Sequence, residues 1–179
     1  MNVLIVDDQV NVVSSLKSGI CWDMLGIKNV YTALNALEAR EIITRYPIDI
    51  LLSDIEMPVE NGLSLLRWCR NSNYLFECIF LTSHADFFYA KEAIQLGSFD
   101  YILQPARYED VEKAIKKAIL RIEENRKEKE YSDYGKAAMP HKNILMKGIL
   151  HDWLTGNDTN MEKALEALKD MDIILQPDS

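Results

Sequence analysis

The chain has 179 residues, of which 48% are hydrophobic and 27% charged, and its formal net charge is −8 at pH 7. This balance fits a globular protein and argues against direct binding of DNA or RNA, because phosphate contacts require clustered lysine and arginine. No apolar run approaches the ~18 residues of a membrane span, and no segment resembles a secretory leader. The three cysteines are dispersed, so we expect buried thiols without a disulfide or metal role, in a cytoplasmic protein.

Strand and helix patterns alternate through the first 120 residues. In chain order we predict strands at 3–6, 30–32, 48–53, 77–81 and 99–103. The helices that follow them are expected at 10–22, 33–46, 62–70 and 86–96, and the fifth helix is expected to begin near residue 107. The run 48–53 is almost continuously apolar, as expected for a strand that is buried on both faces. This (βα)5 pattern predicts the α/β class with a doubly wound parallel sheet.

Polar residues follow four of the predicted strands. They are Asp7, Asp8, Asp54, Thr82 and Gln104. The carboxyl ends of parallel strands meet at one edge of a sheet, and ligands bind there where the strand order reverses, so we expect these side chains to converge. Three clustered carboxylates repel one another unless a cation lies among them. Because hard oxygen ligands suit Mg²⁺, the sequence predicts a magnesium site.

These residues, in this order, resemble the receiver domain of two-component response regulators. The resemblance covers about the first 120 residues and depends on the acidic pair Asp7-Asp8, the phosphoacceptor position Asp54, the loop residues Met57-Pro58 and Asn61-Gly62, the hydroxyl residue Thr82 and the aromatic residue Tyr101. It implies the flavodoxin-like receiver fold with strand order 2-1-3-4-5. One position departs from the family pattern, because Gln104-Pro105 stands where the family has Lys-Pro.

The resemblance implies a role for each site residue. Asp54 is expected to accept a phosphoryl group from a sensor histidine kinase, with Mg²⁺ bound by Asp7, Asp8, Asp54 and the main-chain carbonyl of Glu56. Thr82 is expected to hydrogen-bond the phosphoryl group, and Tyr101 to change position in response. Such a domain is a phosphoacceptor signalling module rather than an enzyme, with slow self-dephosphorylation at most.

Two other interpretations remain open, and Gln104 motivates the first of them. A glutamine donates hydrogen bonds but carries no charge, so its presence in place of lysine weakens electrostatic stabilisation of a phosphoryl group. One alternative is a pseudo-receiver, which dimerises or binds partners without phosphorylation. The other is a phosphatase or related hydrolase on the same fold, although no general acid or base is apparent beyond the acidic cluster. Arg107 is close in sequence to Gln104 and is considered as a replacement cation.

The remaining residues predict three parts in the chain. We assign 1–120 to the receiver domain, 121–139 to a charged helical linker, and 140–179 to a helical extension or the start of a truncated middle domain. The helix that begins near Arg107 carries an apolar stripe, Tyr108, Val111 and Ile115, and its charged continuation is either a solvated helix end or a short coiled coil between two copies.

The phrases 86–90, 99–103 and 149–156 resemble regulators of the Firmicutes that end in an AraC-type DNA-binding domain. We therefore expect a homodimer, formed through the fourth and fifth helices and the Tyr108 stripe. DNA would be contacted only through a C-terminal domain that is absent from this chain, because the predicted helix 161–170 is rich in acidic residues.

Overall fold

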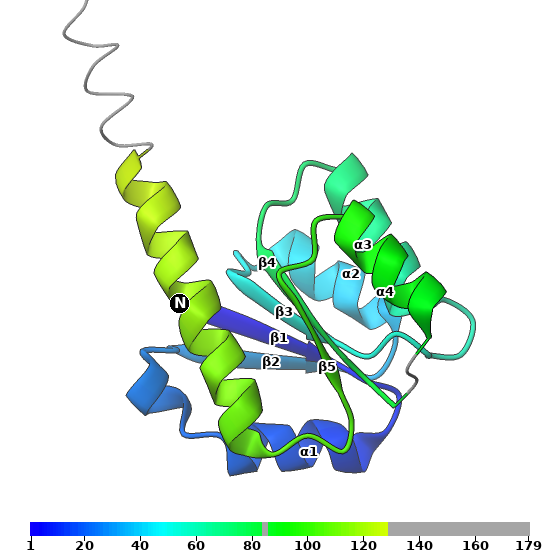
Figure 1. Ribbon diagram of the computed structural model, residues 1–179, viewed down its shortest axis with the longest axis horizontal. Helices are drawn as coiled ribbons and strands as arrows, with labels where there is room; N and C mark the ends of the chain where they lie inside the picture. The colour runs from blue at the N-terminus through cyan, green and yellow to red at the C-terminus, as the bar shows by residue number, and fades with distance from the viewer. Residues whose placement is uncertain (84–85, 129–179) are drawn as a thin grey trace, which may run out of the picture. The chain divides into compact units, whose positions relative to one another are not determined.

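The computed structural model describes residues 1–83 and 86–128. Five parallel strands form one sheet in the order β2-β1-β3-β4-β5 (Figure 1). The strands are β1 (Asn2–Val6), β2 (Asn29–Ala33), β3 (Ile50–Ser53), β4 (Glu77–Thr82) and β5 (Asp100–Leu103). The helices are α1 (Val10–Gly19), the short 3-10 helix η1 (Trp22–Leu25), α2 (Ala36–Arg45), α3 (Gly62–Asn71), α4 (Phe87–Gln95) and a helix over 108–128. The predicted doubly wound sheet is confirmed, including its strand order.

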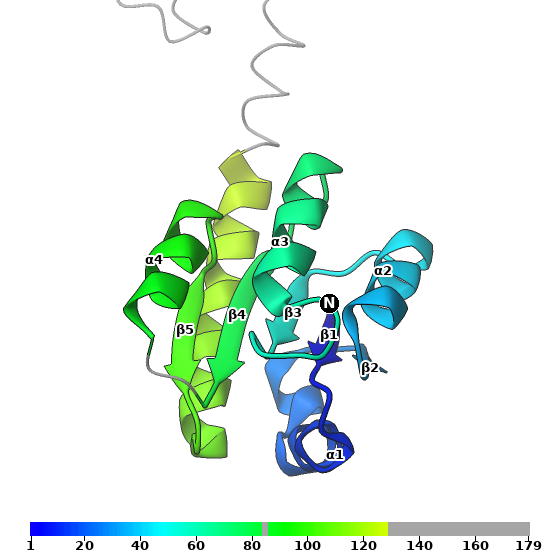
Figure 2. The same cartoon turned by 90° about the vertical axis from the view of Figure 1, so that its right-hand side faces the viewer.

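Helices cover both faces of the sheet (Figures 1 and 2). Successive side chains of a strand point to opposite faces, so β1 contributes Leu4 to the core beneath α2, α3 and α4, and Ile5 to the core beneath α1 and the 108–128 helix. All four residues of β3 are buried, as the apolar run predicts. Two helix layers therefore bury the central strands and fix the edge where these strands end.

Two helix boundaries differ from the prediction by more than one residue. Helix α1 ends at Gly19 rather than continuing to residue 22, and η1 follows, with the Trp22 indole N–H donating to the Lys17 carbonyl at 2.9 Å. Helix α2 begins at Ala36 rather than residue 33, because the Asn35 side chain accepts the Glu38 N–H at 2.9 Å and caps the helix. The start of α2 therefore depends on the capping contact of one polar side chain, which hydrophobic periodicity alone does not show.

The stripe on the 108–128 helix packs inside its own domain. Val111 and Ile115 are buried in the core beneath α1, and Tyr108 lies so close to α1 that a Cβ at Gly19 would be 2.5 Å from its ring. The expectation that this stripe mediates dimerisation is wrong for Val111 and Ile115, because both side chains are already buried in the core of their own domain.

The first compact unit covers Met1–Asn125. The predicted linker 121–139 is described only as far as residue 128, where it is helical, and the predicted extension 140–179 and acidic helix 161–170 lie outside the described residues. Within 1–83 and 86–128, no helix is both long enough and apolar enough to cross a membrane.

Candidate phosphoacceptor site

Three carboxylates meet at the carboxyl edge of the sheet. Asp7 and Asp8 follow β1 directly, and Asp54 follows β3. The two strands pair in parallel, with Val6 opposite Ser53, and the Asp54 N–H donates to the Val6 carbonyl at 2.8 Å. One carboxylate oxygen from each residue lies within 4.8 Å of the other two. The predicted convergence of the three acidic residues is therefore a consequence of strand pairing.

The protein holds these carboxylates in a partly dehydrated position. Asp7 is 3% exposed and Asp54 9% exposed. Burial raises the pKa of Asp7 to about 6, the neighbouring Asp54 and Asp8 raise it further, and the Gln9 N–H, which donates to Asp7 Oδ1 at 2.8 Å, opposes the shift. Burial also raises the pKa of Asp54, against the Ile55 N–H that donates to its Oδ1 at 2.6 Å. The cluster is thus deficient in positive charge, and its donor set of hard oxygens fits Mg²⁺.

The loop between β3 and α3 folds closely against Asp54. The Gly62 N–H donates to the Ile55 carbonyl at 2.9 Å, and a Cβ on Gly62 would lie 2.1 Å from the Asp54 carbonyl oxygen. Only glycine fits there without backbone movement. The Asn61 side chain caps α3 by accepting the Ser64 N–H at 2.8 Å. Gly62 therefore allows the loop to pack against Asp54, and Asn61 caps the helix that leads away from the acidic cluster.

Thr82 lies on β4, which is next to β3, and Tyr101 lies on β5, the edge strand beyond β4. Thr82 ends β4 and is fully buried. Tyr101 of β5 pairs with Phe80 of β4, is half-buried and packs against the core beneath α3 and α4. Burial raises the pKa of the Tyr101 hydroxyl, with further contributions from Asp86 and Asp54, so this side chain lies within electrostatic range of the acidic cluster.

Gln104 directly follows β5. Its N–H donates to the Thr82 carbonyl at 2.8 Å, and its residue lines a pocket between α1 and the 108–128 helix, together with Ser15 and Tyr108. None of the three aspartates lines that pocket. The structure therefore gathers Asp7, Asp8 and Asp54 tightly, and places Gln104 in a neighbouring pocket.

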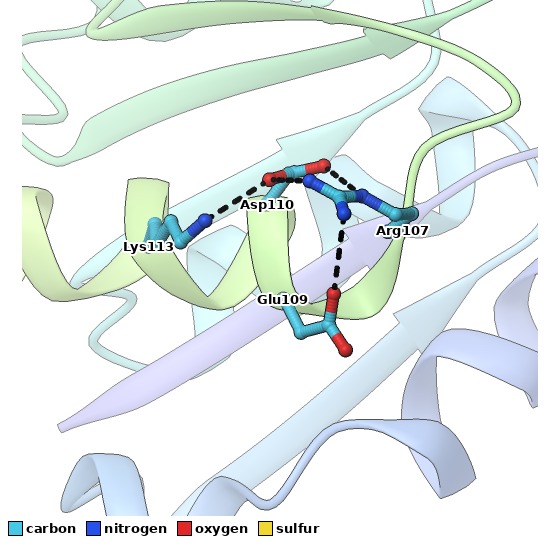
Figure 3. A network of polar contacts seen from close by, with 4 residues as sticks. All are labelled: Arg107, Glu109, Asp110 and Lys113. Atoms are coloured by element: carbon cyan, nitrogen blue, oxygen red, sulfur yellow. Dashed lines mark hydrogen bonds and ion pairs between the residues drawn. The ribbon is translucent and has the colours of Figure 1, made fainter.

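Arg107 directly precedes the 108–128 helix and forms ion pairs with residues of its first turn. Its guanidinium donates to both oxygens of Asp110, at 2.9 and 3.0 Å, and lies 3.8 Å from Glu109, while Lys113 also contacts Asp110 (Figure 3). The Arg107 hydrogen bonds hold the pKa of Asp110 below its usual range. Arg107 thus pairs with carboxylates in the first turn of the 108–128 helix, and its role as a replacement cation stays a prediction.

Two residues near the site carry no role in the sequence analysis. Tyr89 of α4 faces Glu56 of the loop, whose carboxylate is the main cause of a raised Tyr89 pKa. Arg40 of α2 forms an ion pair with Glu60 of the same loop. Both contacts join segments that are distant in sequence, and no local pattern of residue types indicates them.

Comparison with known proteins agrees with this geometry. The family described as the response regulator receiver domain matches residues 3–116. An uncharacterized response regulatory protein from Staphylococcus epidermidis is 31% identical over 120 residues, which are 67% of this chain and 47% of that protein. The transcriptional regulatory protein HptR from Staphylococcus aureus is 35% identical over 112 residues, which are 62% of this chain and 43% of HptR. The chain therefore spans less than half the length of these curated relatives.

Solved structures share the fold. The REC domain of AraT, a response regulator from Geobacillus stearothermophilus, superposes with a TM-score of 0.65 at 30% identity, over 70% of this chain and 97% of that domain. A two component transcriptional regulator AraC from Clostridium phytofermentans gives a TM-score of 0.66 at 25% identity, over 70% of this chain and 98% of that one. The acidic triad Asp7, Asp8 and Asp54 is typical of the Mg²⁺ site of such domains. The chain belongs to the response regulator receiver domain family and is a phosphoacceptor signalling module.

Proposed function

We propose that Asp54 accepts the phosphoryl group from the phosphohistidine of a sensor histidine kinase. The observation that carries this proposal is the approach of three carboxylates to within 4.8 Å at the end of β1 and β3. A carboxylate oxygen of Asp54 attacks phosphorus, the phosphorus–nitrogen bond breaks, and its electron pair leaves with the imidazole, which takes up a proton. The Ile55 N–H orients the Asp54 carboxylate for this attack.

Asp7, Asp8, Asp54 and the main-chain carbonyl of Glu56 would hold Mg²⁺. The ion would neutralise the cluster and the phosphoryl oxygens, so that two negatively charged groups can approach each other. The Gln9 N–H fixes the Asp7 carboxylate, and Gly62 keeps the loop of Glu56 against Asp54. The raised pKa values of Asp7 and Asp54 support this assignment, because a bound cation would relieve the same unfavourable charge.

The phosphorylated state would be relayed through Thr82 and Tyr101 to the surface of α4 and β5. That surface already exposes apolar side chains on α4, where Phe87 and Phe88 are each 76% exposed and Ile94 is 75% exposed. It is the surface through which we propose that two copies associate, since Val111 and Ile115 are buried.

The output would be transcription, through a DNA-binding domain that follows the segment described here. Two similarities support this: one relative is the transcriptional regulatory protein HptR, and one similar structure is an AraC two component transcriptional regulator. We propose a receiver domain over 1–120, a helical linker over 121–139 and the beginning of a further segment over 140–179, in a protein that acts in the cytoplasm.

Intact-mass measurement after incubation with acetyl phosphate and Mg²⁺ tests the acceptor. We expect one added phosphate on the parent protein, none on Asp54→Asn, and one on the control Asp23→Asn, whose side chain is exposed on η1. An equal adduct on Asp54→Asn would refute the assignment of Asp54.

The second candidate function is a pseudo-receiver that works without phosphorylation. Gln104 favours it, because an uncharged residue follows β5 where the family has lysine. Under this alternative, the parent protein gains no phosphate from acetyl phosphate or from a cognate kinase. The parent protein and the Asp54→Asn variant would then have the same association state.

A further inference from the structure

The loop that carries Asp54 and Glu56 has an unfavourable backbone conformation at its apex. Val59 has φ of +72°, and the Glu60 N–H donates to the Pro58 carbonyl at 2.8 Å, which makes a γ-turn centred on Val59. A β-branched residue rarely adopts positive φ. The Val59 side chain is fully exposed, so its own packing does not hold this conformation. Other contacts must stabilise the turn, because such strain persists only where the surroundings enforce it.

One contact of this kind is the ion pair between Glu60 and Arg40. Arg40 comes from the middle of α2, and its Nη2 donates to Glu60 Oε1. The two side chains are only 32% and 25% exposed, so the pair is partly shielded from water. The Arg40 guanidinium also lies over the ring of Trp68 on α3, 4.9 Å from its centroid. Helices α2 and α3 lie side by side on one face of the sheet (Figure 2), and Arg40 links both to the loop apex.

Arg40 is held mainly by these two contacts. Its Nε is buried and has no hydrogen-bond partner among the described residues. A buried donor without a partner is unfavourable, and an apolar residue of similar length would avoid this cost. The need for a guanidinium to hold Glu60 would explain why an arginine, and not an apolar residue, lies at this position.

The loop apex lies next to the acidic cluster. Pro58, Val59 and Glu60 line the same pocket as Asp8. At its base, the loop is fixed by Gly62 against Asp54 and Ile55, so the apex is the part that remains to be held. If the Arg40–Glu60 pair were lost, Val59 could relax toward negative φ, and the chain between Asp54 and Gly62 would move with it.

We propose that Arg40 and Glu60 are positioning residues for the phosphoacceptor site: they hold the strained Val59 turn and thereby fix the loop that presents Asp54 and the Glu56 carbonyl. The inference rests on the proposed function in assigning Mg²⁺ and the phosphoryl group to this loop. Residues that orient metal ligands from outside the ligand set typically change metal affinity by roughly 10- to 100-fold when replaced.

The test compares the full chain with four variants. Arg40→Met keeps an unbranched side chain against Trp68 but removes the guanidinium, and Glu60→Met removes the other half of the pair. Arg67→Met is the matched control, because Arg67 forms its ion pair with Glu92 of α4 instead of with a residue of the loop. Arg40→Met combined with Val59→Asn is the rescue variant, because asparagine tolerates positive φ.

Mg²⁺ affinity by calorimetry and the rate of phosphorylation by acetyl phosphate are measured for each protein. We expect both to fall about tenfold in Arg40→Met and in Glu60→Met, to remain unchanged in Arg67→Met, and to recover most of the loss in the rescue variant. Arg40 forms its ion pair with Glu60 and not with Val59. Recovery by the Val59 substitution would therefore show that the loss in Arg40→Met comes from the conformation of the turn and not from the packing of Arg40.

Several results would overturn the inference: undiminished Mg²⁺ affinity in Arg40→Met, an equal loss in Arg67→Met, or no recovery in the rescue variant. If either single variant fails to fold, the other and the rescue variant still decide it. A parent protein that binds Mg²⁺ but gains no phosphate would refute the proposed function alone, and the Mg²⁺ titrations would still decide the positioning role. A parent that binds no Mg²⁺ would overturn both.

Discussion

Replacing Asp7 by asparagine should stabilise the metal-free protein at neutral pH. Burial raises the pKa of Asp7 from 3.8 to about 6, so the folded state binds the proton more tightly than the unfolded state. Stability therefore falls as the pH rises from about 4 to about 6, and above that range the folded protein carries the full cost of the ionised carboxylate. This difference between the pKa of Asp7 in the folded and the unfolded state corresponds to about 3 kcal/mol.

Asparagine removes this cost without disturbing the local contact. Its Oδ1 still accepts the Gln9 N–H, which Asp7 accepts at 2.8 Å, but its side chain does not ionise. In EDTA at pH 7.5 we expect Asp7→Asn to be about 3 kcal/mol more stable than the parent, and about half that at pH 5. Addition of Mg²⁺ should stabilise the parent and leave the variant almost unchanged, because the variant lacks one of the three charged ligands.

Urea denaturation followed by tryptophan fluorescence measures these differences, since Trp22 is buried in the core beneath α1. Asp23→Asn is the control, because Asp23 is exposed and its replacement should not alter the pH dependence. If Asp7→Asn gave no stabilisation at pH 7.5, or a stabilisation independent of pH, the conclusion that Asp7 ionises at a cost in the folded protein would be wrong.

Three further predictions concern the same site. Asp8→Ala should weaken Mg²⁺ binding in a calorimetric titration, because it removes a hard oxygen ligand, and unchanged affinity would place the metal elsewhere. Gln104→Lys should increase the stability gained on adding beryllofluoride and Mg²⁺, since a charge-assisted hydrogen bond contributes roughly 1.5–3 kcal/mol before the cost of lysine desolvation; a smaller gain would favour the pseudo-receiver. Gly62→Ala should lower the free energy of unfolding by about 2 kcal/mol or more and slow phosphorylation, because the new Cβ would lie 2.1 Å from the Asp54 carbonyl oxygen. An alanine variant with parental stability and rate would show that the loop moves freely there.

The sequence by itself determined the alternation of strands and helices, and with it the sheet edge at which the acidic residues gather. Apolar runs such as Ile50–Ser53 record burial on both faces in the residues themselves, so strand positions could be predicted closely. The positions of Asp7 and Asp54 directly after two such runs predicted one shared edge of the sheet, and the strand order implied by the family resemblance predicted that the two residues are neighbours. Helix ends were less well predicted, because a single cap such as Asn35 sets them.

The tertiary structure alone decided which residues hold the site and which surfaces stay free. The Arg40–Glu60 pair joins residues 20 positions apart on different elements, and no periodic pattern relates them. The same holds for the pocket that Gln104 lines, since α1 and the 108–128 helix form it together. An apolar stripe such as Tyr108, Val111 and Ile115 has the same appearance in sequence whether it packs against its own sheet or a second copy. Only the packing of the helix against α1 and the sheet shows that its core residues are already buried, because burial depends on the neighbours that the fold brings to a side chain.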